Sequence, residues 1–483
     1  MVSLVSCSDF LEISPKNAVT PDNFFQTESD FQQAVDGVYA PLQELYESPG
    51  SWAMAEMRSD NTHYFYNVDF RQPFPEEIAD FISGSENNVS DDRYYINFDM
   101  IARANQVLAV IDEAQFDSSV KENFKGEVLF LRALAYFDLV RFYGGVPLHL
   151  EPANDLESAA LNRSSVEEIY AQVISDATLA TSLLPVKTNQ EAGRATSAAA
   201  WTLLGDVYLT QGEWSLAEEA LLNVSGYSLL DDYAEIFDPS NKNHAESIFE
   251  IQYLENTSLG LESYFPYYFV PLTDQHAELT MGPKGAQSAP LSGWNIPTDD
   301  LIDAYEENDE RFDASIAFIT GPSLISDTSY VKLPYIKKYQ HPHSIFGQTN
   351  QNFPIYRYAE VLLMLAETLN EQGRLAESQE MLNQVRVRAS LNNYNASGQE
   401  DLREAILHER RIELAFENKR WLDLVRTERA VEVMNEYGAK LKSNSDYYYL
   451  SASTYNLNQD DLIFPIPFLE IQVNPDLQQN PGY

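Results

Sequence analysis

Apolar residues occupy nearly every position from 126 to 143, a stretch that reads GEVLFLRALAYFDLVRFY. Gly144, Gly145 and Pro147 follow it directly. Glycine allows the left-handed backbone that ends a helix, and proline cannot continue one. A helix that is apolar on almost all faces must be surrounded by other helices. The pattern therefore predicts a buried helix that ends near residue 143, in a largely helical protein.

A second pattern occurs twice. Residues 201–221 read WTLLGDVYLTQGEWSLAEEAL and fit the tetratricopeptide arrangement W-x2-L-G-x2-Y. Residues 360–382, EVLLMLAETLNEQGRLAESQEML, keep the same frame, with Gly373 and Ser378 at the places of Gly212 and Ala217. Small residues at such positions let paired helices approach closely. We expect these two helix pairs, and degenerate pairs at 127–143 with 165–184 and around 404–425.

Residues 225–350 are different in kind. They are rich in Pro, Gly, Ser, Asn and Tyr and contain short strand-like pieces such as SIFEIQYL. We interpret them as a loop-rich insert in a helical scaffold of about 21–224 and 351–435, followed by a tail at 436–483. The helical units on the two sides need each other, so we expect one mainly α domain over 21–483, preceded by a flexible segment at 1–20.

The charge balance narrows the possible partners. The chain has 31 basic and 74 acidic residues, a net charge of −43. Nucleic-acid binding depends on Lys and Arg that displace counterions from phosphate, so we exclude it. The apolar runs also fall short of the roughly 20 residues that span a bilayer.

Four segments together carry a family resemblance: 24–43, 126–147, 408–426 and the closing 464–483, with FPIP and NPDLQQNPGY. They resemble the SusD/RagB family of nutrient-binding lipoproteins. In 408–426, HERRIELAFENKRWLDLVR, Asn418 stands where glycine is common, and asparagine tolerates a left-handed turn better than most residues. The resemblance implies tetratricopeptide-type helix pairs packed as one body, with a loop-rich aromatic insert. It also implies a non-enzymatic protein that captures a glycan and passes it to a SusC-like TonB-dependent transporter.

The single cysteine, Cys7, lies in LVSCSDFLE, which looks like a lipobox. The acidic Asp9 and Glu12 after it resemble a surface-export signal of Bacteroidota lipoproteins. Only six residues precede Cys7, too few for a whole signal peptide. By resemblance, we expect a full-length form that is lipidated at Cys7 and anchored on the extracellular face of the outer membrane.

Glu409, Glu413 and Glu417 raise the question of acid/base catalysis, because glycoside hydrolysis uses two carboxylates. Their spacing places them on one helical face, where nearby arginines would keep them ionised. We expect a structural ion-pair lattice here, and the same role for Arg132, Asp138 and Arg141. The sequence has no HExxH motif and no phosphate loop, so we expect no catalytic residues, no metal and no cofactor.

The 29 tyrosines suggest a carbohydrate site. A sugar ring has an apolar face that packs on Tyr or Trp, and hydroxyls that bond to polar side chains. In SusD-like proteins early loops and the middle insert form an aromatic platform. The resemblance carries that role to Asp60, Tyr64, Tyr66, Arg71, Tyr94, Tyr267, Tyr268 and Trp294. We expect Tyr94 just before a helix; the alternative for each residue is ordinary loop packing.

Three other functions stay open at this point. A RagB-like member would capture peptides, a tetratricopeptide adaptor would bind a protein in its groove, and a glycosidase would release sugar. Within the carbohydrate hypothesis, the net charge favours a neutral glycan.

Overall fold

The computed structural model describes residues 24–68, 71–255, 258–271, 279–283, 292–322 and 330–483. The Cys7 lipobox and the whole of the expected N-terminal segment, 1–20, lie outside these residues. Eighteen α-helices and six short strands are described. The helices are α2 (Glu28–Glu47), α3 (Pro49–Trp52), α4 (Pro73–Ala79), α5 (Asn88–Leu108), α6 (Ser118–Tyr143), α7 (Leu156–Ala159), α8 (Val166–Leu183), α9 (Ser197–Thr210), α10 (Trp214–Leu222), α11 (Phe265–Tyr268), α13 (Asp299–Ile302), α14 (Glu310–Ser315), α15 (Tyr358–Glu371), α16 (Leu375–Arg388), α17 (Gln399–Glu413), α18 (Arg420–Arg426), α19 (Ala430–Ser443) and α20 (Phe468–Val473).

The strands form three separate antiparallel pairs, β1–β3, β2–β6 and β4–β5. Their bounds are β1 (Thr62–His63), β2 (Ser247–Ile251), β3 (Ile296–Pro297), β4 (Ile316–Pro322), β5 (Tyr330–Ile336) and β6 (Phe353–Arg357). The protein is therefore mainly α, as predicted, and all strands except β1 and β6 belong to the expected insert.

Helix α6 is the buried helix that the sequence predicts. It ends at Tyr143, and Gly144 follows with a left-handed φ of 71°. The segment after α19 returns to this helix end: Phe464 N donates to Phe142 O at 2.7 Å, and Asn480 Nδ2 donates to Tyr143 O at 2.9 Å. The closing motif of the sequence thus secures the C-terminal end of the central helix.

Both tetratricopeptide helix pairs are present, as α9 with α10 and α15 with α16. A Cβ on Gly205 would lie 2.5 Å from Leu221 Cδ2, so only glycine permits this approach of α9 and α10. In the second pair, Ser378 takes the place of Ala217, and its hydroxyl donates to Ala366 O at 2.6 Å. Helices α6 and α8 pack together as the degenerate pair that we expected.

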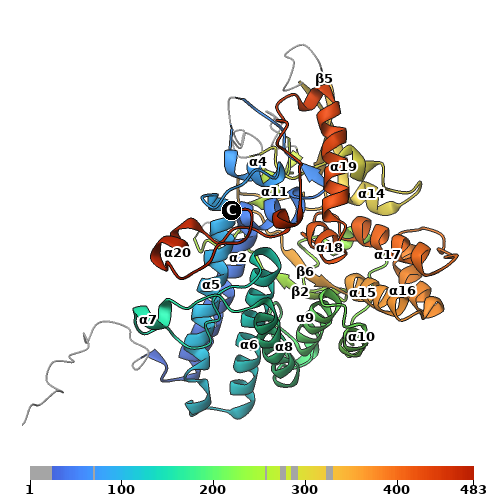
Figure 1. The fold of residues 1–483 in the computed structure, drawn as a ribbon. Coiled ribbons are helices and arrows are strands. Elements are labelled where there is room, and N and C mark those ends of the chain that lie inside the picture. Colours follow the sequence, from blue (N-terminus) through green and yellow to red (C-terminus); the bar gives the residue numbers. More distant parts are fainter. Residues whose placement is uncertain (1–23, 69–70, 256–257, 272–278, 284–291, 323–329) are drawn as a thin grey trace, which may run out of the picture.

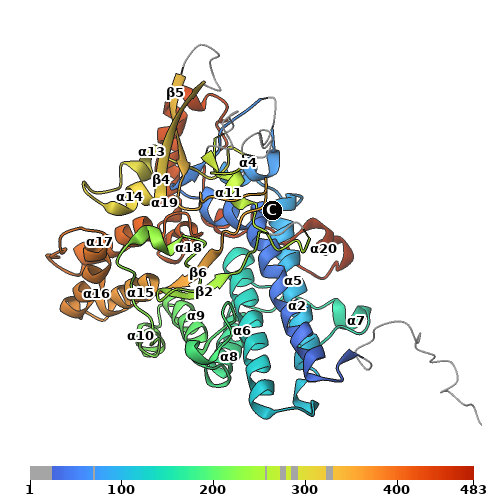
Figure 2. The same ribbon diagram turned by 180° about the vertical axis from the view of Figure 1, so that it is seen from behind.

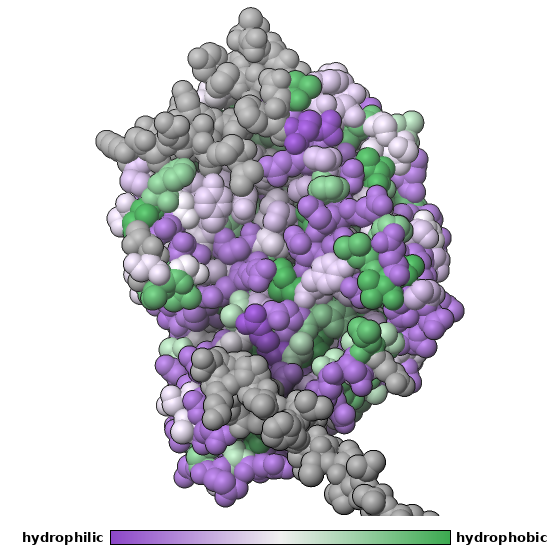
Figure 3. Space-filling view, turned by 90° about the vertical axis from the view of Figure 1, so that its left-hand side faces the viewer, coloured by the Kyte–Doolittle hydropathy of each residue, from purple (hydrophilic) through white to green (hydrophobic). Residues whose placement is uncertain are grey.

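Figures 1 and 2 show how these elements are arranged. The long helices α2, α5 and α6 form one flank, α15–α17 form the other, and α8–α10 lie between them at the lower end. Strands β4 and β5, with α4, α11, α14 and α19, lie at the upper end. On the face seen in Figure 3, hydrophobic residues form small separate groups among hydrophilic ones. None of the described helices has the length and apolar character needed to cross a bilayer.

Candidate functional site

Strand pairing brings the early loop of the chain to the insert. After α3 the chain forms one turn of π-helix, Ala53–Met57, and then β1. Thr62 pairs with Pro297 and His63 with Ile296. The next residues continue the approach, because Phe65 N donates to Gly293 O at 2.8 Å. Tyr64 therefore lies beside Trp294, more than 200 residues away in sequence.

A continuous set of aromatic rings results, which we call the aromatic cluster. From the floor outward, ring-centroid distances are 6.1 Å for Trp52–Trp294, 5.9 Å for Trp294–Tyr64 and 5.7 Å for Tyr64–Tyr449. Tyr449 then stacks on Tyr66 at 4.1 Å with 4° between the planes. The cluster consists of Trp52, His63, Tyr64, Tyr66, Tyr264, Tyr267, Tyr268, Trp294, Tyr447, Tyr448 and Tyr449.

The floor of the cluster is buried and its rim is accessible. Trp52, Tyr64 and Trp294 are at most 5% exposed, whereas Tyr448 is 64% exposed. Tyr66 and Tyr449 are partly exposed. The rim, rather than the floor, is therefore the part that a ligand can reach.

Arg71 adds a polar group to this rim. Its guanidinium carbon lies 4.8 Å from the Tyr66 ring centroid, and Nη1 donates to the Tyr66 hydroxyl at 3.2 Å. The side chain is 45% exposed and is held in place by an ion pair with the buried Glu76 of α4. A flat ring beside an oriented cation offers both stacking and hydrogen bonding to a ligand.

Beneath the rim, burial changes two ionisation equilibria. The Tyr64 hydroxyl donates to Asp80 Oδ2 at 2.7 Å. Burial raises the pKa of Asp80 to about 7 despite that hydrogen bond. Burial also lowers the pKa of His63, which stacks on Tyr447, to about 3. Both groups thus favour their neutral forms, as expected for a floor sealed from water.

Tyr267 and Tyr268 join the cluster from α11. The Tyr268 ring lies 5.6 Å from Trp52, and Tyr264 connects it to Tyr267. Tyr267 itself is 1% exposed, and its hydroxyl shares a 2.6 Å hydrogen bond with His343 Nε2. This part of the cluster thus connects α11 to Trp52 of the early segment and to His343 of the insert.

Two predicted site residues lie apart from the cluster. Asp60 is 3% exposed and forms ion pairs with Arg420 at 2.8 Å and Arg411 at 3.0 Å. Burial opposes its ionisation, but the two arginines outweigh that effect and lower the pKa of Asp60 to about 2. The carboxylate is therefore already fully paired.

The predicted position of Tyr94 before a helix is wrong. Helix α5 begins earlier, at Asn88, because the Asn87 side chain caps it by accepting from Val89 N. Tyr94 consequently lies within α5, 2% exposed, with its ring 4.7 Å from Phe98 and 5.2 Å from Tyr143.

Six members of the cluster are absent from the predicted site: Trp52, His63, Tyr264 and the run Tyr447, Tyr448 and Tyr449. The run of three tyrosines after α19 was a visible signal in the sequence. It falls in the predicted tail, 436–483, and nothing in the local sequence indicates that this tail returns to β1.

The three glutamates Glu409, Glu413 and Glu417 form the expected ion-pair lattice, and each is at most 2% exposed. Their partners are cations from other elements of the chain rather than arginines close by in the sequence: Arg311, Lys338, Arg357, Arg386 and Arg388. Burial opposes ionisation of Glu413, yet Arg388, Arg357 and Arg311 hold its pKa well below the usual range. Glu413 is therefore a structural anion and a poor proton donor.

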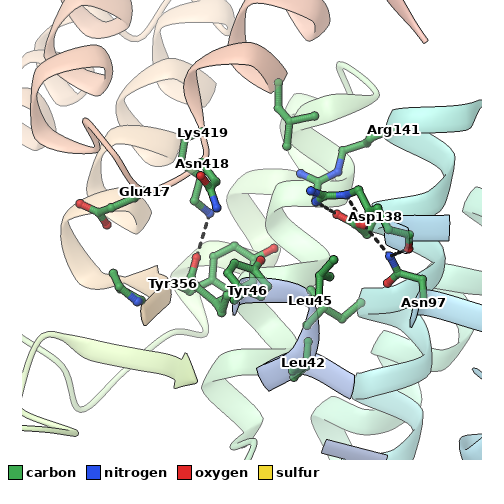
Figure 4. A pocket seen from close by; sticks show the side chains of 15 residues that line it. Leu42, Leu45, Tyr46, Asn97, Asp138, Arg141, Tyr356, Glu417, Asn418 and Lys419 are labelled. Atoms are coloured by element: carbon green, nitrogen blue, oxygen red, sulfur yellow. Dashed lines mark hydrogen bonds and ion pairs between the residues drawn. The ribbon is translucent and has the colours of Figure 1, made fainter. Parts of the chain in front are cut away.

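A neighbouring cavity, of about 40 Å³, separates this lattice from the N-terminal helices. Figure 4 shows Leu42, Leu45 and Tyr46 at its base and Asp138 and Arg141 of α6 on one side. It has room for little more than a water molecule. Over the described residues, no group of three or more His, Cys, Asp or Glu side chains is placed to hold a metal ion.

Comparison with known proteins agrees with this architecture. A family model described as starch-binding and associating with the outer membrane matches residues 9–209, and the SusD family model matches residues 319–483. A SusD-like protein from Formosa agariphila is 28% identical, covering 100% of this chain and 97% of its own length.

Solved structures give the same result. A SusD superfamily protein from Bacteroides vulgatus is 25% identical with a TM-score of 0.78, and a laminarin-binding SusD-like protein is 26% identical with a TM-score of 0.78. Each alignment covers 95% of this chain and 100% of the other. The chain therefore belongs to the SusD-like family of starch- and glycan-binding outer-membrane proteins.

Proposed function

We propose that this protein captures an oligo- or polysaccharide at the rim of the aromatic cluster and passes it, unchanged, to a SusC-like TonB-dependent transporter. It would do so from the extracellular face of the outer membrane, held by a lipid on Cys7. The observation that carries the proposal is the stacked, partly exposed pair Tyr66–Tyr449, flanked by Tyr448 and Arg71.

The chemistry of the rim favours a neutral sugar polymer. The exposed ring of Tyr448 and the parts of the Tyr66–Tyr449 pair that remain accessible offer apolar surface for pyranose rings, while Arg71 and the tyrosine hydroxyls offer hydrogen bonds. Individual contacts of this kind contribute little net free energy, so we expect a modest affinity that increases when several sugar units bind.

The carboxylates nearest the rim support a non-catalytic role. Glu76 is 3% exposed and paired with Arg71, and Asp80 is 6% exposed beneath Tyr64. A glycosidase needs two carboxyl groups on either side of a glycosidic bond. Asp80→Asn should therefore leave glycan binding unchanged, and a reducing-sugar assay of the wild-type protein should detect no release.

Affinity electrophoresis tests the binding site directly. The protein is run through gels containing starch, laminarin, xylan, mannan or an acidic polysaccharide, beside the double variant Tyr66→Ala, Tyr449→Ala. We expect a neutral glycan to retard the wild type, and the variant to migrate as it does without glycan, because the stacking surface is removed. Tyr208→Ala, on the distant helix α9, is the matched control and should be retarded like the wild type.

Equal retardation of the double variant and the wild type would place the binding site elsewhere. Absence of retardation in every gel, together with binding of a peptide mixture, would contradict the proposal and favour a RagB-like peptide function.

A further inference from the structure

A second cavity, of about 300 Å³, lies among the scaffold helices, away from the aromatic cluster. Helices α6, α8, α9, α15, α17 and α18 all contribute to its wall. In Figures 1 and 2 these helices lie below α4 and α11, which border the cluster. The cavity is large enough for a small organic molecule.

The floor of this cavity contains an incompletely paired arginine. The Arg410 side chain is 3% exposed, and its Nε donates to Asp423 Oδ2 at 2.9 Å. Its Nη2 lies 3.7 Å from Glu360 Oε1, beyond hydrogen-bond length. Its Nη1 is buried with no hydrogen-bond partner among the described residues, and the same is true of Thr210 Oγ1 in the same wall. Buried polar groups of this kind are costly unless something pairs with them.

A second arginine in the wall is also loosely held. Arg141 is 15% exposed, and Nε donates to Phe137 O at 3.1 Å. The carboxylate facing it, Asp206, remains 3.7 Å from Nη1 and instead accepts a 2.9 Å hydrogen bond from the Tyr356 hydroxyl. Figure 4, which draws the smaller cavity described above, shows Arg141 and Lys419 on opposite sides; both residues also line the second cavity.

The other cations in the wall are satisfied by the protein. Arg426 pairs with Glu367 and with Asp423 at 2.8 Å. Lys419 Nζ donates to Ile355 O at 2.8 Å and lies 3.0 Å from Glu360. The side chains in the wall whose hydrogen-bonding groups are not fully used by the protein are therefore Arg141, Arg410 and Thr210.

We propose that this cavity binds a small organic monocarboxylate, with its carboxylate on Arg141 and Arg410 and its body against the apolar wall. Guanidinium groups form strong, directed hydrogen bonds with carboxylates. Val140, Tyr170, Leu422 and Val425 supply apolar surface, which an inorganic anion would leave uncovered. Three carboxylates, Asp206, Glu360 and Asp423, also line the wall and disfavour a dianion.

The negative charge of the whole protein does not prevent this binding. Exposed charges are screened over about 8 Å at physiological ionic strength, whereas contacts inside a cavity are screened much less. Val166, 39% exposed, marks the outer rim of the cavity, so the arginines are reached from that side.

Calorimetric titration of the whole protein tests the proposal with four probes. Glucuronate carries a carboxylate on a sugar ring, and glucose is its uncharged counterpart. Benzoate carries a carboxylate on an apolar ring, and benzyl alcohol is its uncharged counterpart. We expect saturable binding of at least one acid and none of its counterpart. Glucuronate alone would identify a sugar acid as the ligand, and benzoate alone an apolar acid.

Two variants locate the binding. Arg141→Gln should weaken it by about tenfold or more, since hydrogen bonds to charged groups are the stronger ones. Val166→Trp should block the entrance without removing a cation. Arg103→Gln, an exposed arginine of α5, is the control and should bind like the wild type.

Three results would overturn the proposal: no preference for the acids over their counterparts, unchanged binding in both variants, or displacement of the acid by equimolar phosphate. Glycan retardation should persist in Val166→Trp, so this test is independent of the aromatic cluster.

Discussion

At the scale of single residues, Asp60 shows how the scaffold holds the start of the early loop. Its carboxylate bonds to Arg420, while Arg411 bridges it to Asp300 at the beginning of α13. Thr298 Oγ1 also donates to Asp60 O at 2.7 Å. Asp60 thus connects α17, α18 and the insert just before β1 begins, which gives it a positioning role for the aromatic cluster.

Asp60→Asn should lower the free energy of unfolding at pH 7 by about 3–5 kcal/mol, the usual cost of breaking a buried ion pair. Because the folded pKa of Asp60 is about 2 and lies below the unfolded value, this stability is present above about pH 4 and is lost as the pH falls toward 2. Urea unfolding of both proteins should therefore show the difference shrinking by about 1 kcal/mol at pH 3. A difference that is constant with pH would show that the ion pairs do not set the stability.

Residue-level prediction worked where the cause is local. Asn418 has the expected left-handed φ of 61°, a conformation that asparagine tolerates better than most residues. The burial of Asp60 was not predictable, because its arginine partners lie more than 350 positions away. Tyr66, Arg71 and Trp294 were selected for their chemistry, and the structure brings them into one region. Their role in binding stays a prediction.

At the scale of elements, the contact between α9 and α10 shows that the glycine of the tetratricopeptide pattern allows two helices to pack closely. Leu221 of α10 occupies the space where a Gly205 side chain would be. The repeated frame predicted both helix pairs because the same small-residue positions recur. No repeated spacing of this kind surrounds Tyr447, Tyr448 and Tyr449. Their position beside β1 could therefore not be predicted from the sequence.

Gly205→Ala should destabilise the protein by about 1–3 kcal/mol, the usual cost of overpacking a core. Gly37→Ala on α2 is the matched control: its Cβ would meet nothing within 4 Å, so we expect a gain of about 0.5–1 kcal/mol from helix propensity. Chemical denaturation measures both. Equal effects of the two substitutions would show that the α9–α10 contact adapts to the extra methyl group.

At the scale of the whole molecule, the charge is distributed unevenly between interior and surface. Cations such as Arg311, Arg357 and Arg388 are at most 3% exposed and pair with buried carboxylates. With only 31 basic residues against 74 acidic ones, the surface therefore holds most of the excess negative charge.

The melting temperature should consequently rise by a few degrees when NaCl is raised from about 10 mM to about 300 mM, because shortening the Debye length screens self-repulsion. Differential scanning calorimetry measures this shift. A fall in melting temperature would instead indicate that exposed ion pairs contribute more than the repulsion does.

The members of the aromatic cluster range from Trp52 to Tyr449 along the chain, and this spread has a consequence for biosynthesis. The stacked pair cannot form until the ribosome has synthesised Tyr449, nearly 400 residues after Tyr66. Contacts between such distant segments form slowly. Helices α2 to α19 are all synthesised before Tyr449, so the aromatic rim is among the last parts of the protein to form. Only a chain synthesised beyond Tyr449 can present the complete rim to a ligand.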